Sequence, residues 1–271
     1  MLGRIELFLA IFGAEKLERM LEICAIASGS NGNCYYIGNE KDAVLIDAGI
    51  SCKQIVQRMK LRNLNPLKIK AVFITHEHSD HLSGARVFGN RMQVPVYLTS
   101  KTWYGAYKNL RPDVPKFFNP GEIIEVGEFA IHSFSKNHDA SEPCSFRVQY
   151  REKSIGVFTD IGEPCENVTS HLQKCDGLFL ETNYDEKMLW EGRYPWFLKQ
   201  RVASGVGHLS NKQAFDLLHS HSGENLKCVF LSHLSKENNT PEIAINSMQP
   251  FTSRFEIKLT SRFEAGEVYQ F

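Results

Sequence analysis

The residues best suited to chemistry form one dense cluster, HEHSDH at positions 76–81, directly after an apolar run. Imidazole and carboxylate groups together suit zinc, manganese or iron. His76 and His78 are two positions apart, so in extended backbone their side chains project to the same side. Asp80 and His81 follow where we expect the chain to turn into a helix, and they could reach a second ion. A solvated polar loop is the alternative interpretation.

Three further residues of ligand type follow apolar segments elsewhere in the chain. His138 comes just after FAIHSFS, Asp160 ends IGVFTD, and His233 ends CVFLSH. Ligands for the same ions should sit at strand ends that face one cleft. Each residue alone is weak evidence, because an aspartate at a strand end is most often a turn residue. Together with the cluster they predict two ions, each with its own protein ligands, and one shared carboxylate.

The elements that must position these residues are mostly short strands separated by polar loops. We expect hairpins over residues 121–135, hinged at Gly127, and over residues 144–160. Helices are predicted over 52–60 and over 211–221, the second capped by Ser210 or Asn211. Further strands are predicted over 21–27, 34–38, 43–47, 69–75, 94–99, 176–182 and 227–233, and in the tail. No Pro-rich or Ser-rich linker divides the chain, so an α/β layered fold with a two-sheet core is expected in one domain.

Composition excludes several classes of protein. The 31 basic and 31 acidic residues balance, which gives no global signal for nucleic acid and leaves a local basic patch open. The 7 cysteines include no C-x-x-C pair, which argues against a disulfide framework or a zinc ribbon and favours a reducing compartment, the cytoplasm. No apolar run approaches the roughly 20 residues of a membrane span, so no membrane association is expected.

The first residues raise a separate hypothesis. Residues 1–19 hold an interrupted apolar patch with neither a clean hydrophobic region nor a small-residue cleavage site, so they do not resemble a signal peptide. Met20 opens a well-formed strand. One hypothesis is that residues 1–19 are an extension outside a single domain of residues 20–271. The other is that they form an ordinary amphipathic helix.

The order VLIDAG, THEHSDH, NHDAS, FTDIG and FLSH resembles the metallo-β-lactamase superfamily, from about residue 21 to at least residue 240. The resemblance implies a four-layer αββα sandwich and two divalent metal ions per chain, for which zinc, manganese and iron remain open. It implies that Asp47 braces the metal-binding loops without being a ligand. The implied ligands are His76, His78 and His138 for the first ion, Asp80, His81 and His233 for the second, and Asp160 for both.

Two further segments resemble the nucleic-acid-processing branch of that superfamily, as in ribonuclease Z. LETNYD supplies Glu181 and GVGHLSNKQAFDLL supplies His208, although the second motif has Gly-His-Leu-Ser where the branch has Gly-His-Ser. The resemblance implies that the pair helps to protonate the leaving oxygen. In the alternative, His208 binds phosphate without proton transfer.

The lengths of two segments between the ligand motifs narrow the resemblance to one branch of the superfamily. Residues 139–159 leave no room for the tRNA-gripping arm of ribonuclease Z, and residues 161–232 are too few for the inserted domain of ribonuclease J-type enzymes. The compact chain most closely resembles the YycJ/WalJ family, bacterial proteins with 5′-to-3′ DNA exonuclease activity linked to repair. That implies DNA as partner, as single strands or 5′ ends. Repair-protein partners and the oligomeric state stay open.

Candidate substrate-binding residues lie in two segments. In the SGSNGN loop, Ser28, Ser30, Asn31 and Asn33 could hold a terminal phosphate, although a tight loop also needs Gly and Asn. Asn183, close to Glu181, is another candidate. In EGRYPWFLKQR, Arg193 and Arg201 alternate with aromatic residues and could grip a single strand. The alternative there is a helix with a buried aromatic face and solvated cations. The histidines that match no motif, assigned to surface or packing roles, are His132, His171, His219 and His221.

The leading hypothesis is a two-metal phosphodiesterase in which hydroxide bridging the ions attacks phosphorus. Asp80, His208 and Glu181 are its expected catalytic residues. Two divalent ions with Asp80 and Asp160 leave about two positive charges, which suits a phosphate and also a carbonyl substrate. A small-substrate, cyclic phosphodiesterase uses the same residues. An acyl hydrolase of the lactamase or thioesterase type would leave Glu181 and His208 idle. A non-catalytic metal-binding or interaction protein is the least favoured hypothesis, because every expected ligand is present.

Overall fold

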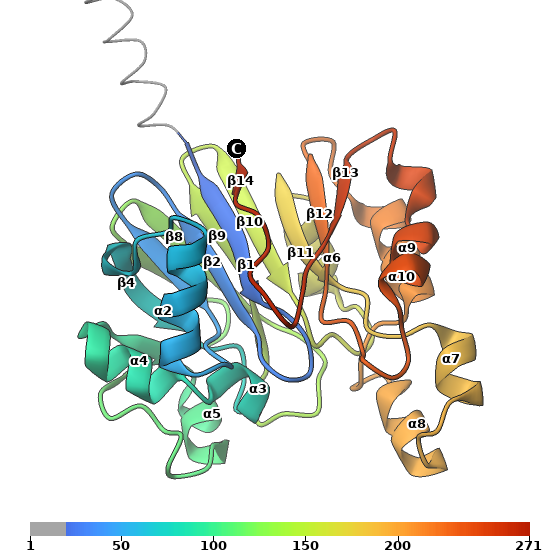
Figure 1. The fold of residues 1–271 in the computed structure, drawn as a ribbon, viewed down its shortest axis with the longest axis horizontal. Helices are drawn as coiled ribbons and strands as arrows, with labels where there is room; N and C mark the ends of the chain where they lie inside the picture. The colour runs from blue at the N-terminus through green and yellow to red at the C-terminus, as the bar shows by residue number, and fades with distance from the viewer. Residues whose placement is uncertain (1–19) are drawn as a thin grey trace, which may run out of the picture.

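Two mixed β-sheets pack face to face, and helices cover the outer face of each sheet (Figure 1). The computed structural model describes residues 20–271. Its layers confirm the predicted α/β, four-layer αββα sandwich. Both hypotheses about residues 1–19 concern residues outside those described.

The first sheet has the strand order β14-β1-β2-β3-β4-β5-β6. Strands β1, β2 and β3 are antiparallel neighbours, whereas β3 to β6 run parallel. Strands β3 and β4 are buried on both faces and are therefore apolar along almost all of their length, whereas the edge strand β6 is largely exposed. Their bounds are β1 Glu22–Ala27, β2 Cys34–Gly38, β3 Ala43–Ile46, β4 Ile69–Phe73, β5 Val96–Leu98, β6 Pro115–Phe117 and β14 Tyr269–Gln270.

The second sheet has the order β13-β12-β11-β10-β9-β8-β7 and repeats the same scheme. The hairpins β7–β8 and β9–β10 are antiparallel, and β10 to β13 run parallel. Gly127, with φ +58°, forms the predicted hinge of the first hairpin. The bounds are β7 Ile123–Val126, β8 Phe129–Ser135, β9 Cys144–Tyr150, β10 Lys153–Phe158, β11 Gly177–Glu181, β12 Cys228–Ser232 and β13 Glu256–Leu259.

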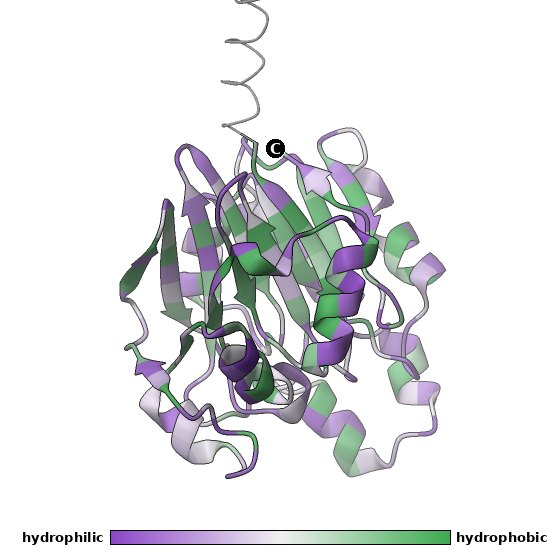
Figure 2. Cartoon of the chain, turned by 60° about the vertical axis from the view of Figure 1, so that its left-hand side comes forward, coloured by the Kyte–Doolittle hydropathy of each residue, from purple (hydrophilic) through white to green (hydrophobic). Residues whose placement is uncertain are grey.

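Aromatic side chains fill the space between the sheets. Phe73 from the first sheet lies with its ring centroid 5.6 Å from that of Phe146, and Tyr35 lies 4.9 Å from Phe179. All four side chains are fully buried. Figure 2 shows this apolar interior along the strands, with polar residues alternating on the outer helices. Burial of this kind stabilises the fold by roughly 25 cal/mol per Å² of apolar surface.

The longer helices follow their sequence signals. Helix α2 (Cys52–Leu61) begins with a capping box between Ser51 and Gln54, and α9 (Asn211–His221) has the same device between Ser210 and Gln213. Both predicted helices are confirmed, and Ser210 rather than Asn211 is the cap. The remaining helices are α3 Ser79–Leu82, α4 Ala85–Met92, α5 Ser100–Gly105, α6 Glu166–Leu172, α7 Glu186–Glu191, α8 Trp196–Val202, α10 Pro241–Ser247 and the 3₁₀ turns η1 Pro66–Lys68 and η2 Gln249–Phe251.

The carboxyl ends of β3, β4, β10, β11 and β12 share one edge of the sandwich, where α3 and α8 also lie (Figure 1). In open α/β sheets, ligands bind at this edge. All 7 cysteines are free thiols, as expected from their spacing. Among residues 20–271, no helix is both long and apolar enough to cross a membrane.

Candidate metal centre and active site

One group of three histidines gathers His76, His78 and His138. Strand β4 delivers His76, His78 is the N-cap of α3, and His138 follows β8. One ring nitrogen from each lies within 4.8 Å of the others. His76 Nε2 is 3.0 Å from His78 Nδ1, which places these two nitrogens together as the extended spacing predicted. The geometry suits the three nitrogen ligands of one divalent ion.

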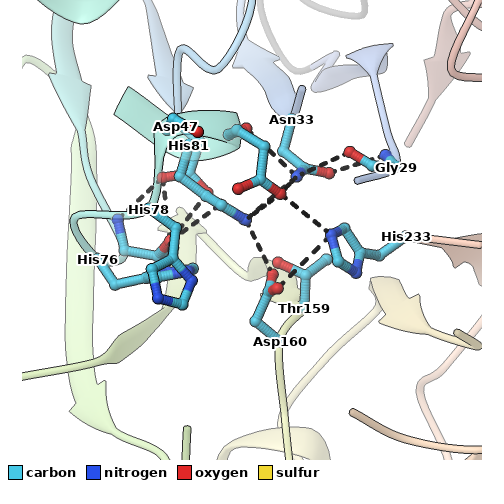
Figure 3. Close-up of polar contacts among 12 residues, drawn as sticks. Gly29, Asn33, Asp47, His76, His78, His81, Thr159, Asp160 and His233 are labelled. Carbon is cyan, nitrogen blue, oxygen red and sulfur yellow. Dashed lines mark hydrogen bonds and ion pairs between the residues drawn. The ribbon is translucent and has the colours of Figure 1, made fainter. Parts of the chain in front are cut away.

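A second group joins Asp80, His81 and His233, whose ligand atoms also lie within 4.8 Å of one another. Helix α3 carries Asp80 and His81, and His233 follows β12. Asp160, after β10, lies between the two groups (Figure 3). Its Oδ2 is 3.1 Å from His81 Nε2, and its Oδ1 is 3.5 Å from His233 Nε2 and 3.9 Å from His138 Nε2.

The backbone is strained where these side chains are positioned. Asp47, Asp160 and His233 all adopt left-handed conformations, with φ of 61°, 55° and 56°. Each such residue costs on the order of 1–3 kcal/mol and persists only where its surroundings hold it. Asp47 and His233 follow a strand directly and Asp160 follows β10 after one residue, so each turn aims the side chain across the edge of the sheets rather than along the strand.

Most of the histidines use one ring nitrogen for a fixed protein partner, so the other can face the centre. His81 Nδ1 is 2.7 Å from Asp47 Oδ2, and His138 Nδ1 is 3.0 Å from the Gly207 carbonyl oxygen. His233 Nδ1 is 3.1 Å from Glu181 Oε1. Such partners fix the ring orientation and tautomer of a metal-bound histidine.

The buried Nε2 atoms of His138 and His233 have no hydrogen-bond partner in the described structure. Leaving a buried nitrogen unpaired costs free energy, and here both point at ionised carboxylates. A divalent cation would satisfy these atoms together with the oxygens of Asp80 and Asp160. The residues present therefore fit divalent metal ions of the kind that histidine and carboxylate bind.

The protonation states of His76, His138 and Asp160 favour metal binding. Burial lowers the pKa of His76 well below its ordinary value, and burial likewise lowers the pKa of His138 to about 4. Burial would raise the pKa of Asp160, but the facing His233 and His81 outweigh it and hold that pKa well below its usual range. At neutral pH His76, His138 and Asp160 are thus neutral imidazoles and an ionised carboxylate, the forms that coordinate a cation. Burial would lower the pKa of His233, but the facing carboxylates, Asp160 first, raise it to about 10, so a cation must displace that proton to bind there.

Glu181 links the buried centre to His208, a partly exposed residue that marks the opening of the centre to solvent. Its Oε1 is 2.7 Å from His208 Nδ1, and its Oε2 accepts hydrogen bonds from the backbone N–H groups of Ile161 and Leu209. Glu181 is fully buried, whereas the His208 side chain is 22% exposed. Burial would raise the pKa of Glu181, but its interactions with His208 and His233 lower it to about 2. The carboxylate is therefore ionised and holds His208 with the other ring nitrogen free.

The substrate-binding candidates in the SGSNGN loop differ in their exposure to solvent. Ser28 and Asn33 are buried, while Ser30 and Asn31 are exposed. Ser28 Oγ accepts a hydrogen bond from His233 N at 2.8 Å, and Asn33 Nδ2 donates to the carbonyls of Gly29 and Asp80. These two side chains therefore hold the ligand loops in place, and the exposed pair remains free to contact a substrate.

Asn183, Arg193 and Arg201 also lie in different settings. Asn183 is buried, and its Nδ2 donates to the His233 carbonyl at 2.8 Å. Arg193 is exposed, and Arg201 Nε lies 2.5 Å from Asp139 Oδ2. The alternative of a buried aromatic face is wrong for α8, because Trp196 and Phe197 are exposed and the buried side chains are Lys199 and Val202.

Two residues near the centre were missed at the level of sequence. Glu77 Oε1 accepts from both the N–H and the hydroxyl of Ser141, each at 2.7 Å, and so ties the histidine cluster to the loop after His138. Thr75 lies between the Asp47 carboxylate and His76 Nδ1, 2.9 Å from the latter. The position of Thr75 before HEHSDH is the only sequence signal for this role, and nothing local predicts Ser141 as the partner of Glu77.

The comparisons with known proteins agree with this geometry. A family model described as the metallo-beta-lactamase superfamily matches residues 27–208. The chain is 34% identical to an exodeoxyribonuclease YycJ of Bacillus anthracis over 92% of this chain and 94% of that protein. It is 36% identical to an exodeoxyribonuclease WalJ of Streptococcus pneumoniae over 82% and 85% of the respective chains.

A solved structure shares the fold at much lower sequence identity. The metallo-beta-lactamase fold protein YhfI from Bacillus subtilis superposes with a TM-score of 0.69 and is 16% identical, covering 93% of this chain and 99% of that one. At this identity the likeness concerns the fold alone.

Proposed function

The chain belongs to the metallo-β-lactamase superfamily, and within it we propose that it is a two-metal phosphodiesterase that degrades DNA from 5′ ends. It is a metal-dependent hydrolase of the family whose curated members are named exodeoxyribonucleases. The 5′-to-3′ polarity, a role in DNA repair, a cytoplasmic location and the two-ion count belong to the proposal.

The observation that carries the proposal is the pairing of Glu181 with His208 beside the metal-ligand cluster. An acyl hydrolase with this cluster would have no use for a second, carboxylate-supported histidine at the opening. An enzyme that cleaves a phosphodiester does need such a histidine, because the departing sugar oxygen needs a proton. The His208 Nδ1 is occupied by Glu181 at 2.7 Å, so Nε2 is the nitrogen left to supply it.

The ions would be held by the two ligand groups described above, with Asp160 shared. The chemistry that two bound divalent ions supply is polarisation of the phosphoryl oxygens and a lowered pKa of water. Zinc, manganese and iron all suit this donor set.

The remaining work falls to side chains of the protein itself. Asp80, whose side chain is 22% exposed, would hold an ion on the side of the centre that faces the phosphate. His208 holds a proton on Nε2 for the leaving oxygen. Glu181 keeps His208 in the correct tautomer and stabilises its positive charge. Ser30, Asn31 and Arg193, the exposed candidates, contact the DNA strand outside the centre.

The test is a comparison of substrates with metal-loaded protein. DNA labelled at the 5′ end, in single-stranded and double-stranded form, is incubated beside RNA, a cyclic nucleotide phosphate and a lactam reporter, with Asp80→Ala as the inactive control. We expect short products released from the 5′ end of DNA, and elemental analysis to give two ions per chain.

Two outcomes would contradict the proposal. Lactam turnover with intact nucleic acid would point to an acyl hydrolase. Turnover of the cyclic nucleotide alone would point to the small-substrate phosphodiesterase, which shares every ligand residue and differs in the shape of the opening.

A further inference from the structure

The segment between Glu181 and His208 exposes three large rings. Trp190, Trp196 and Phe197 are 43%, 65% and 71% exposed, and we call them the aromatic platform. They lie on α7 and α8, which stand away from the sheets at the edge that holds the active site (Figure 1). Several exposed rings in one short segment usually mark a binding surface.

The residues beneath the aromatic platform are tightly packed and hydrogen-bonded. Leu189 and Val202 form a small buried cluster of their own with Tyr184. Lys199, itself buried, donates from Nζ to the Trp190 carbonyl oxygen at 2.6 Å and so ties α8 to the end of α7. The Trp190 and Trp196 rings lie 5.5 Å apart between centroids. The rings are therefore held outward by packing behind them.

One end of α8 is fixed to the active site. Arg201 Nε lies 2.5 Å from Asp139 Oδ2, and Asp139 adjoins the ligand-type residue His138. The backbone N–H of His208 donates to the Val202 carbonyl at 2.9 Å. Helix α8 has 7 residues, so Trp196 stands about 9 Å along the axis from Val202. That distance corresponds to about three stacked bases at 3.4 Å each.

The chemistry around the aromatic platform selects the occupant. Arg193 is exposed, and the Arg201 side chain is 57% exposed although it is paired with Asp139, whereas Lys199 is buried. From Arg193 to Arg201 the chain contains no acidic residue, and Glu191 follows Trp190 directly. Aromatic rings beside cations suit a nucleic-acid strand, which offers flat base faces along an anionic backbone. In a duplex the faces of the bases are covered by their neighbours, so only a single strand offers them.

We propose that the aromatic platform stacks the bases of a single-stranded DNA segment a few nucleotides from the phosphodiester being cleaved. The inference rests on the proposed function for its substrate, and it adds residues that neither touch the metal centre nor take part in the chemistry. It makes the enzyme favour single strands that extend past the cleavage point over short fragments.

Binding and catalysis are measured separately. Fluorescence anisotropy of a labelled oligothymidylate is followed with metal-chelated, full-length protein, so that nothing is cleaved. Trp196→Ala should weaken binding about tenfold, the range for loss of one stacked base, while Trp196→Phe stays close to the wild type. Trp196→Leu, which keeps an apolar side chain without a π-face, should behave as Trp196→Ala. Tryptophan fluorescence should be quenched by the oligonucleotide in the wild type and less so in Trp196→Phe.

The activity arm distinguishes this inference from the proposed function. Metal-loaded Trp196→Ala should hydrolyse bis(p-nitrophenyl) phosphate, too small to reach the aromatic platform, as the wild type does, and should lose the preference for long single strands. A wild type that cleaves no phosphodiester would overturn the proposed function, while anisotropy would still decide the binding.

Three results would overturn the inference itself. The first is unchanged oligothymidylate binding in Trp196→Ala and in the double variant with Phe197→Ala. The second is full binding in Trp196→Leu. The third is an altered oligomeric state of the variants by size exclusion with DNA binding intact, which would make the aromatic platform a protein contact. Phe117→Ala, an exposed ring on β6, is the matched control and should bind as the wild type.

Discussion

The carboxylate of Glu181 lies 2.7 Å from Nδ1 of His208, and the carboxylate is fully buried while the imidazole faces the opening. The same oxygen lies 3.1 Å from Nδ1 of His233. One buried charge therefore orients both a histidine of the metal-ligand cluster and the histidine that we assign to proton transfer. Replacing Glu181 would disturb both at once, so the separate role of His208 must be tested at His208.

His208→Ala should lower kcat for DNA by about 10²–10⁴, the usual contribution of a positioned general acid. The loss should be much smaller for bis(p-nitrophenyl) phosphate, because nitrophenolate departs without a proton. His208 also lies within 4.8 Å of ligand atoms of Asp160 and His233, but its Nδ1 is held by Glu181 at 2.7 Å, so metal content should stay at the wild-type level. Steady-state kinetics on the two substrates, with elemental analysis, make the measurement.

The matched control is His219→Ala, on the exposed side of α9, which should change neither substrate. An equal loss on DNA and on the nitrophenyl diester would assign His208 to substrate binding alone. That result would support the alternative in which His208 contacts phosphate without transferring a proton.

Asp47→Asn should weaken metal binding about 10–100-fold, as replacement of a group behind a metal ligand usually does. Asp47 Oδ2 accepts from His81 Nδ1 at 2.7 Å, and Oδ1 accepts from the Thr75 N–H at 2.9 Å. An asparagine tolerates the left-handed backbone at this position and can keep the bond to Thr75. It removes the charge that holds the His81 tautomer. Competition with a metal-binding dye measures the change.

Asp113→Asn serves as the comparison, because Asp113 is a surface carboxylate paired with Arg86. It should leave metal affinity unchanged. If Asp47→Asn bound metal as tightly as the wild type, the carboxylate would be serving the fold of the loop rather than the orientation of His81.

The parts of the site that sequence could predict are those with a local signal. Asp160 and His233 are of ligand type and end apolar strands, and the structure brings both beside the HEHSDH cluster. The sequence could not tell whether Ser28 and Asn33 bind substrate or hold the loop, because hydroxyl and amide groups suit a phosphate and a tight loop equally. Only the contact of Ser28 with His233, 205 residues away in the chain, reveals the supporting role.

The same limit applies to the helices. Helix α9 has a capping box and a periodic apolar face, so its bounds could be predicted. Helix α8 contains aromatic and cationic residues in close alternation, and both faces were plausible as the buried one. Its orientation is set by tertiary contacts of Lys199 and Val202, which place the rings outside.

His171 should make stability depend on pH below neutrality. It accepts a hydrogen bond from Arg147 Nε at 3.3 Å and stacks on Phe134. Burial, reinforced by Arg147, lowers the pKa of His171 from 6.5 to about 4. The folded protein therefore disfavours the protonated ring that the unfolded chain accepts. The resulting stability is complete above pH 6.5 and is lost as the pH falls toward about 4.

Urea unfolding of the wild type and of His171→Gln, at pH about 7.5 and about 5, tests this dependence. The wild type should lose more stability than the variant between the two values, because glutamine does not titrate. His219→Gln, at an exposed histidine, should follow the wild type. A stability difference between the wild type and His171→Gln that is the same at both pH values would contradict the prediction.

Gly49→Ala should disrupt the metal centre although Gly49 is no ligand. A Cβ at this position would lie 1.6 Å from the Asp80 carbonyl oxygen and 2.7 Å from Asn33 N. Neither atom can move freely, since Asn33 N donates to that carbonyl at 2.7 Å and Gly49 N donates to the Asn33 carbonyl. The clash must displace Asp80, so we expect metal affinity to fall at least about tenfold and stability by about 1–3 kcal/mol.

Gly266→Ala, whose Cβ would meet nothing closer than 3.8 Å, is the control for thermal unfolding and dye competition. Wild-type metal affinity in Gly49→Ala would show that the loop carrying Asp80 yields without moving the ligand, and would contradict the close packing inferred for it.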